Sequence, residues 1–243
     1  MPSATEHYEH HLAPIYVWMA GGMDAAITRG RAEVDAVCSR PATSQWAVDL
    51  GAGFGMHAIP LADIGYSVLA IDSSGTLLDA MQGHLGARPI TIVKDDLLSF
   101  RKHLKGPAAL IVCMGDTLTH LPDRQSVKSL FADVAKALED DGTFVVTFRD
   151  YSTPLTGAKR FIPVRSDADR ILTCFLEYGD DTVTVHDILH ERDGSQWRQR
   201  VSAYRKLRLS SGWVARALGA NGFHVKNEQG FAGMARLIAK RTP

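Results

Sequence analysis

The chain has 243 residues, of which 45% are hydrophobic and 22% charged, and its formal net charge at pH 7 is zero. This composition is typical of a globular protein that buries a sizeable core, in one large domain or in a domain with an insertion. A balanced charge gives no strong field toward nucleic acid or an anionic membrane, so we expect neither as a partner, although charge alone does not exclude nucleic acid.

The first 40 residues are rich in aromatic side chains between His7 and Met19, and residues 23–38 have the spacing of an amphipathic helix. Such an arm predicts a helical cap on a sheet edge, a lid over a ligand, or both. His10 and His11 are neighbours, but no third ligand follows at a fixed spacing, so we expect solvated histidines and no metal site.

Residues 46–72 predict a strand, a glycine-rich turn, a helix and a second strand that ends in Asp72. Glycines stand at alternate positions of the turn, at Gly51, Gly53 and Gly55. Glycine lets the backbone approach a ligand closely, and an acid about 20 residues later can accept hydrogen bonds from a ribose. This stretch predicts one half of a nucleotide-binding α/β fold.

The spacing of the glycines separates two kinds of nucleotide-binding fold. A dinucleotide fingerprint needs Gly-x-Gly-x-x-Gly, and this chain has Met56 where the third glycine belongs. The pattern from Asp49 to Gly55 is Asp-x-Gly-x-Gly-x-Gly, which resembles the first motif of the class I S-adenosylmethionine (SAM) dependent methyltransferases. An NAD-linked oxidoreductase, or a fold of this type that binds nothing, is the alternative.

A helix capped by Ser73 or Ser74 is expected to follow and to run through Gln82, before a third strand over residues 90–93. A fourth strand, residues 108–114, is apolar throughout, as a parallel strand covered on both faces should be. An amphipathic helix over residues 123–138, with Asp123 as its cap, and a fifth strand over 143–148 come next.

The segment from residue 152 to 208 has a different pattern. Strands are predicted over residues 170–178, 182–190 and 197–207, joined by short turns, which makes an antiparallel meander. A helix capped by Ser210 or Ser211, residues 213–218, and a closing pair of strands over 223–227 and 234–240 end the chain.

The arm and the inserted meander extend the resemblance to small-molecule methyltransferases of the glycine N-methyltransferase and aminosugar N,N-dimethyltransferase type. The resemblance implies a Rossmann-like α/β fold with a seven-stranded sheet whose last strand is antiparallel. We divide the chain into an arm (1–40), a SAM-binding core (41–151), an antiparallel insertion over the substrate site (152–208) and the rest of the core (209–243).

The resemblance also implies the site residues. Cofactor contacts are expected from Asp49, Gly51, Ala52, Gly53, Asp72, Ser73, Asp95, Asp96, Leu97, Met114 and Gly115. An acid after the third strand should contact the adenine amino group; Asp96 is favoured over Asp95, and the alternative is that either caps the following turn. Substrate contacts are expected from Tyr8, Tyr16, His120, Arg149 and Tyr204.

His120 and Tyr16 are the catalytic candidates. An imidazole can take a proton near neutral pH, and the alternative is that His120 only fixes its turn. Arg149 can bind a carboxylate or phosphate, or it can pair with Asp150. Arg165, His186, Trp197 and Arg200 of the meander are further candidates that alternation alone does not rank.

We therefore predict an enzyme that transfers a methyl group from SAM to nitrogen or oxygen of a small molecule. A nucleic-acid or protein methyltransferase and a non-catalytic SAM-binding protein are the alternatives. Cys38, Cys113 and Cys174 lack metal spacing, and the sequence shows neither a signal-peptide pattern nor a transmembrane run, so we expect a cytoplasmic protein. Oligomeric state is left open, with a homodimer as one option.

Overall fold

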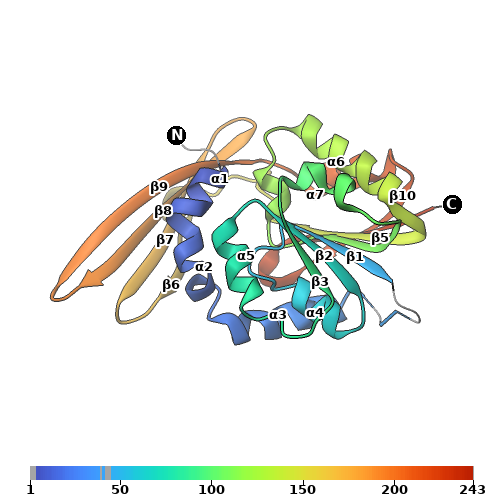
Figure 1. The fold of residues 1–243 in the computed structure, drawn as a ribbon. Helices are drawn as coiled ribbons and strands as arrows, with labels where there is room; N and C mark the ends of the chain where they lie inside the picture. The colour runs from blue at the N-terminus through green and yellow to red at the C-terminus, as the bar shows by residue number, and fades with distance from the viewer. Residues whose placement is uncertain (1–3, 39, 42–44, 243) are drawn as a thin grey trace.

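The larger of two β-sheets carries the fold. The computed structural model describes residues 4–38, 40–41 and 45–242. Seven strands are ordered β10-β11-β5-β4-β1-β2-β3 (Figure 1). They are β1 Trp46–Leu50, β2 Ser67–Asp72, β3 Ile90–Lys94, β4 Ala108–Cys113, β5 Leu138–Phe148, β10 Phe223–Gln229 and β11 Ala235–Arg241.

Strands β1 to β5 pair in parallel, whereas β11 is antiparallel to both β5 and β10. The predicted seven-stranded sheet with one antiparallel strand is therefore confirmed. Strands β2 and β3 extend the sheet on one side of β1, whereas β4 and β5 extend it on the other. The direction in which strands are added therefore reverses beside β1. Ligands of open α/β sheets bind at such a reversal, beyond the carboxyl ends of the strands.

Helices cover both faces of this sheet because its central strands β1, β2 and β4 are apolar on both sides. On β4, Leu110 and Val112 pack into one core cluster and Ile111 and Cys113 into the other. The helices are α4 Ala58–Asp63, α5 Gly75–Gln82, α6 Arg124–Ala137 and α7 Ser211–Gly219. The expected caps are present at α5, α6 and α7, where Ser74, Asp123 and Ser210 each accept a backbone amide.

The smaller sheet has four antiparallel strands, one more than the sequence predicted. They are β6 Phe161–Ser166, β7 Arg170–Tyr178, β8 Thr182–Asp193 and β9 Gln196–Leu207. The sequence did not predict β6, because the strand contains Pro163 and a proline within a run of residues argues against a strand. A proline is tolerated here because β6 lies at the sheet edge, next to a register shift between Pro163 and Arg165.

The first part of the arm lies between the two sheets, and its last helix lies beside α4 of the core (Figure 1). The arm consists of α1 Ala4–His7, a π-helical turn η1 Tyr8–Leu12, α2 Ala13–Met19 and α3 Met23–Asp35. Leu12 and Ile15 pack into one cluster with Leu172, Val185 and other side chains of the smaller sheet. No helix among the described residues is long and apolar enough to cross a membrane.

The arm packs tightly on the core at Gly30 of α3, where an added Cβ would lie 1.9 Å from the backbone oxygen of Met56. We expect Gly30→Ala to lower the free energy of unfolding by about 1–3 kcal/mol or more, because α3 must move away from the turn. Urea denaturation measures the change. Gly219→Ala is the control, since no atom lies within 4 Å of a Cβ there; it should be neutral or stabilising. Equal losses in both variants would contradict the packing argument.

Candidate functional site

The glycine-rich turn lies where β1, β2 and β4 end. Because β1 pairs in parallel with both neighbours, the three carboxyl ends lie side by side. The amides of Gly51 and Ala52 donate to the carbonyl oxygen of Ile71, at 2.9 Å each. The carboxylate of Asp72, the next residue, accepts the amide of Gly53 at 2.8 Å. The turn after β1 is thus fixed to the tip of β2.

The three glycines of the turn are needed for different reasons. All have positive φ, of 76° at Gly51, 53° at Gly53 and 91° at Gly55. A Cβ on Gly51 would meet Thr117 at 2.4 Å, and one on Gly55 would meet Met81 at 2.7 Å, so both allow close packing. At Gly53 the nearest atom would be 3.8 Å away. Gly53 is therefore the glycine whose open side can face a ligand.

Asp49 is a carboxylate buried beneath this turn, only 1% exposed. It accepts the amide of Ala58, but its Oδ2 has no hydrogen-bond partner in the described part of the chain. Burial, and to a lesser degree the charge of Asp72, raises the pKa of Asp49 to about 6, although His57 opposes the shift. A buried oxygen without a partner is costly, and a cationic donor would remove that cost.

The arm covers the turn. Glu9 accepts hydrogen bonds from the hydroxyls of Ser74 (2.6 Å) and Thr76 (3.1 Å) at the start of α5. The ring of Tyr16 lies 5.9 Å from that of Phe54, inside the turn. The arm is therefore packed at the edge of the sheet where a ligand is expected. The sequence had predicted a helical cap, a lid over a ligand, or both.

Four predicted substrate residues form one aromatic cluster. The ring of Tyr8 lies 5.1 Å from His120, 5.7 Å from Tyr16 and 5.9 Å from Tyr204, measured between centroids. His120 and Tyr204 are stacked at 5.5 Å with 6° between their planes. The four side chains come from the arm, from the segment after β4 (η3, Thr117–His120) and from β9. The structure thus brings together groups that lie up to about 200 residues apart.

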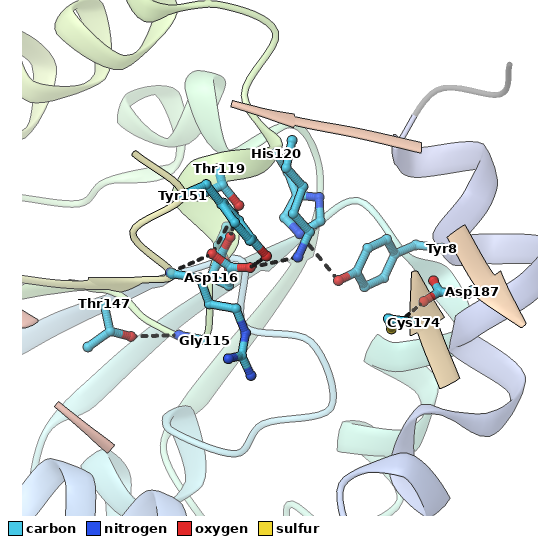
Figure 2. A network of polar contacts seen from close by, with 12 residues as sticks. Tyr8, Gly115, Asp116, Thr119, His120, Thr147, Tyr151, Cys174 and Asp187 are labelled. Atoms are coloured by element: carbon cyan, nitrogen blue, oxygen red, sulfur yellow. Dashed lines mark hydrogen bonds and ion pairs between the residues drawn. The ribbon is translucent and has the colours of Figure 1, made fainter. Parts of the chain in front are cut away.

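The surroundings of His120 favour its neutral form. Burial, followed by the positive charge of Lys206 and by His7, holds the pKa of His120 well below its usual value. Its Nε2 lies 3.3 Å from the hydroxyl of Tyr8, and its buried Nδ1 has no partner among the described residues (Figure 2). Burial raises the pKa of Tyr8 well above 10. The pair can donate and accept hydrogen bonds, but a low pKa makes His120 a weak base.

Asp116 connects this cluster to three other segments and was not among the predicted site residues. It is buried and adopts a left-handed conformation, φ 79°. Its Oδ1 accepts the amide of Arg149 (2.9 Å) and the hydroxyl of Thr119 (3.0 Å). Its Oδ2 accepts Lys206 Nζ at 2.6 Å and, more weakly, the hydroxyl of Tyr151 (Figure 2).

Lys206 was also missed, although alternation along β9 places it on the same face as Tyr204. Burial alone would lower the pKa of Lys206, but the charge of Asp116 and the nearby tyrosines outweigh burial and raise it. The environment of Lys206 therefore favours the charged ammonium form. It lies 5.5 Å from the ring of Tyr204, which is a cation–π contact.

A second buried polar group fixes the arm to the smaller sheet. His7 Nε2 donates to Asp187 at 2.8 Å, and the hydroxyl of Ser202 lies 2.7 Å from His7 Nδ1. The thiol of Cys174 donates to the other oxygen of Asp187 (Figure 2). His10 is exposed as expected, but the expectation that His11 is solvated was wrong, since it is buried against the same sheet.

The remaining predicted residues lie around the rim. Asp95 pairs with Lys102 and with His103 (2.7 Å each), which lowers its pKa, and Asp96 caps η2 (Leu97–His103) through the amide of Leu98. These contacts agree with the alternative in which an acid after the third strand caps the following turn. Ser73 is exposed beside Asp72, and Met114 is buried below Gly115.

Arg149 does not form the alternative ion pair with Asp150 among the described residues. Asp150 instead accepts the amides of Ser152 (2.9 Å) and Ser211 (2.8 Å). The guanidinium of Arg149 is exposed at the carboxyl end of β5. Arg149 forms no ion pair with any other described residue, so a cation is available at this end of the sheet.

Residues 47–142, which hold the glycine-rich turn and the strands on either side of it, match the family described as "Methyltransferase domain". This stretch, 96 of the 243 residues, resembles a methyltransferase domain. The match confirms the resemblance that the pattern from Asp49 to Gly55 indicated.

Two curated relatives align with part of this chain. The glycine/sarcosine/dimethylglycine N-methyltransferase of Actinopolyspora halophila is 25% identical over 115 residues, which cover 44% of this chain and 20% of that protein. The cypemycin N-terminal methyltransferase of a Streptomyces species is 28% identical over 164 residues, which cover 60% and 65%. The chain thus spans about a fifth of the length of the first relative.

A solved structure extends the likeness beyond the methyltransferase domain. The CcbJ methyltransferase of Streptomyces caelestis superposes with a TM-score of 0.78 at 19% identity, over 97% of this chain and 98% of that one. The methyltransferase fold, including the arm and the inserted sheet, therefore accounts for nearly the whole chain.

The ion pair between Lys206 and Asp116 yields a prediction of stability. Lys206→Met should lower the free energy of unfolding by about 3–5 kcal/mol, because it leaves the Asp116 carboxylate buried without its cation. The double variant Lys206→Met/Asp116→Asn should lose less than the sum of the single losses. Arg198→Met, which breaks an exposed pair with Asp193, should cost less than about 1 kcal/mol. Urea denaturation of Lys206→Met, Asp116→Asn, the double variant and Arg198→Met tests this, and strict additivity of the two single losses would contradict it.

Asp49 yields a prediction of pH dependence. Since its folded pKa is raised to about 6, the folded state holds this proton more tightly than the unfolded state. The protonated Asp49 makes its full contribution to the free energy of unfolding below about pH 4. This contribution is lost as the pH rises through about 6, a difference of roughly 3 kcal/mol. The stability of Asp49→Asn relative to the natural protein should therefore increase across that interval in urea denaturation. A pH-independent difference would contradict the burial of an ionisable Asp49.

Proposed function

We propose that the protein is a SAM-dependent methyltransferase that acts on a small-molecule acceptor. The single observation that carries the proposal is that Oδ2 of Asp49, buried beneath a turn that is open at Gly53, has no hydrogen-bond partner within the described part of the chain. The amino-acid tail of SAM carries an ammonium group, which suits a buried carboxylate, and its ribose carries hydroxyls, which suit Asp72. When bound, SAM supplies a methyl group on a cationic sulfur.

The residues proposed to hold SAM come from adjacent strand ends. They are Asp49, Gly51, Ala52, Gly53, Asp72, Ser73, Met114 and Gly115. For the adenine of SAM, the resemblance implies contacts from Asp95, Asp96 and Leu97. Glu9 and Tyr16 close the arm over the turn, and a closed arm excludes water from the transfer step.

The acceptor is proposed to bind at the aromatic cluster of Tyr8, Tyr16, His120 and Tyr204. A nitrogen acceptor becomes cationic as it receives a methyl group, and ring faces attract that charge. The neutral His120 can accept a hydrogen bond from the acceptor and orient it. We favour nitrogen over oxygen, because a hydroxyl needs a base and the low pKa of His120 makes it a weak one.

Arg149 is proposed to select acceptors that carry a carboxylate. Its guanidinium is exposed at the carboxyl end of β5, and its amide is fixed by Asp116, the residue that also holds Lys206. A planar guanidinium binds a carboxylate through two parallel hydrogen bonds. Amino acids, whose amine and carboxylate are a fixed distance apart, are therefore the first acceptors to test.

The cofactor is tested by thermal shift. SAM and S-adenosylhomocysteine at 100 times Kd should add about 2.7 kcal/mol of stability, which raises Tm by about 2–4 °C, and NAD and NADP should add none. Gly53→Ala should abolish the shift, because its Cβ occupies the open side of the turn without a clash inside the protein. Gly219→Ala should keep the full shift. A shift with NAD alone would overturn the assignment.

Turnover is tested by release of S-adenosylhomocysteine with glycine, an amino sugar and a peptide with a free N-terminus as acceptors. Tyr8→Phe and His120→Asn should lower kcat at least tenfold while the thermal shift with SAM is retained, since neither residue is proposed to hold SAM. Binding of SAM without turnover of any acceptor would count against an enzyme and in favour of a SAM-binding protein.

A further inference from the structure

A large aromatic side chain, that of Phe231, is exposed at the tip of the hairpin that joins β10 to β11. Its exposed fraction is 54%. Single exposed apolar side chains are common on protein surfaces, so exposure alone does not indicate a binding site. Two further observations do: the conformation of the tip, and the place of the tip in the sheet.

The base of the hairpin holds the tip in an unfavourable conformation. Ala232 is left-handed, with φ 51° and ψ 31°, a region that residues other than glycine rarely adopt. Below it, the amide of Gly230 donates to the carbonyl oxygen of Met234 at 2.8 Å. Arg236 and Glu228, which pair across the two strands, form an ion pair at 2.6 Å. Backbone strain persists only where surrounding contacts enforce it, and it is frequent at binding sites.

The tip lies beyond the carboxyl end of β5. Ala235, the first residue of β11, pairs with Phe148, the last residue of β5. Because these strands are antiparallel, the residues before Ala235 continue past the end of β5, as Arg149 does on its own strand. Ligands of open α/β sheets bind beyond this edge. Phe231 and Arg149 therefore stand at the same edge, at the ends of adjacent strands.

Arg149 and Phe231 also lie on the same face of the sheet. Val145 of β5 packs into the core cluster that contains side chains of α3 and α4. Alternation along β5 directs Arg149, four residues later, toward this same face. The guanidinium of Arg29, which comes from α3, lies 5.9 Å from the centre of the Phe231 ring. The tip is thus folded toward the face on which Arg149 lies.

Arg29 connects Phe231 to the arm and to the glycine-rich turn. Its guanidinium lies 3.4 Å from the carbonyl oxygen of Ala20, at the end of α2, and 3.7 Å from Sδ of Met56. One side of the Phe231 ring is therefore occupied by a cation that the arm and the core hold in place. The rest of the ring is exposed at the edge where the acceptor is proposed to bind.

A guanidinium and an aromatic ring together suit an amino acid with an apolar side chain. The α-carbon of an amino acid directs its amine, its carboxylate and its side chain in three different directions. With the amine at the aromatic cluster and the carboxylate on Arg149, the side chain is left to contact the apolar surface at this edge, which Phe231 supplies. Removing an apolar side chain from water against that ring strengthens binding. Glycine has no side chain to place there.

From this arrangement we infer that Phe231 is a specificity-determining residue of the acceptor site, and that the acceptors are amino acids with apolar side chains rather than glycine. The inference rests on the proposed function, because it uses the proposed role of Arg149. One methylene in a hydrophobic site discriminates by roughly tenfold or more. The difference between glycine and leucine should therefore be large enough to measure.

Isothermal titration calorimetry tests the inference without requiring turnover, with glycine and L-leucine titrated into protein saturated with S-adenosylhomocysteine. The natural chain should bind L-leucine at least about tenfold more tightly than glycine. Phe231→Ala should remove this preference and leave the Kd of glycine unchanged, with an unchanged unfolding curve because the ring is exposed. Phe231→Leu should retain most of the preference. Trp197→Ala is the matched control, since this aromatic side chain is 43% exposed on β9; it should retain the full preference.

Arg149→Gln separates the two proposed contacts. It should weaken the binding of glycine and of L-leucine by the same factor, since both carry a carboxylate, whereas Phe231→Ala should weaken that of L-leucine alone. Binding of neither amino acid, equal binding of both, or a preference that Phe231→Ala retains would each overturn the inference. Failure of the proposed function is seen separately, as a missing thermal shift with SAM or as no release of S-adenosylhomocysteine with any acceptor.

Discussion

One buried carboxylate holds the site together. Asp116 receives an amide from the end of β5, a hydroxyl from the turn that carries His120, and an ammonium from β9. A buried charge is stable only when it is paired and hydrogen-bonded, so these segments cannot separate without exposing or orphaning it. Through this one residue the inserted sheet becomes part of the same site as the methyltransferase core.

The arm contacts both the core and the inserted sheet. Glu9 reaches the start of α5 in the core, while His7, two residues earlier, binds Asp187 in the inserted sheet. The π-helical turn η1 begins between them, at Tyr8, and directs that side chain into the aromatic cluster. Such turns are often found at functional sites, because the extra residue changes the direction of the side chains. The position of Tyr8 therefore depends on contacts with both sheets.

Local patterns were enough to predict the parts of the fold that depend on them. The run from Asp49 to Gly55 predicted the turn and its family, and the alternation in β8 predicted the meander. The network around Asp116 was not predictable, because Lys206 lies 90 residues away and nothing near either residue indicates the other. Strand β6, which contains Pro163, was not predictable for a related reason. Whether a strand tolerates a proline depends on whether it lies at a sheet edge, which is a property of the assembled sheet. His11 was taken as solvated because sequence alone does not show that the arm packs on a sheet.

Strand β9 presents Tyr204 and Lys206 on one side and Trp197 and Val201 on the other. Since successive side chains of a strand alternate, the removal or insertion of one residue within β9 would exchange the two sets completely. Point substitutions can therefore be tolerated along this strand wherever the chemistry is kept, whereas changes in its length cannot. In a family of related chains, the amino acids of β9 should vary more readily than the number of its residues. A longer version of this strand would require residues to be added in pairs.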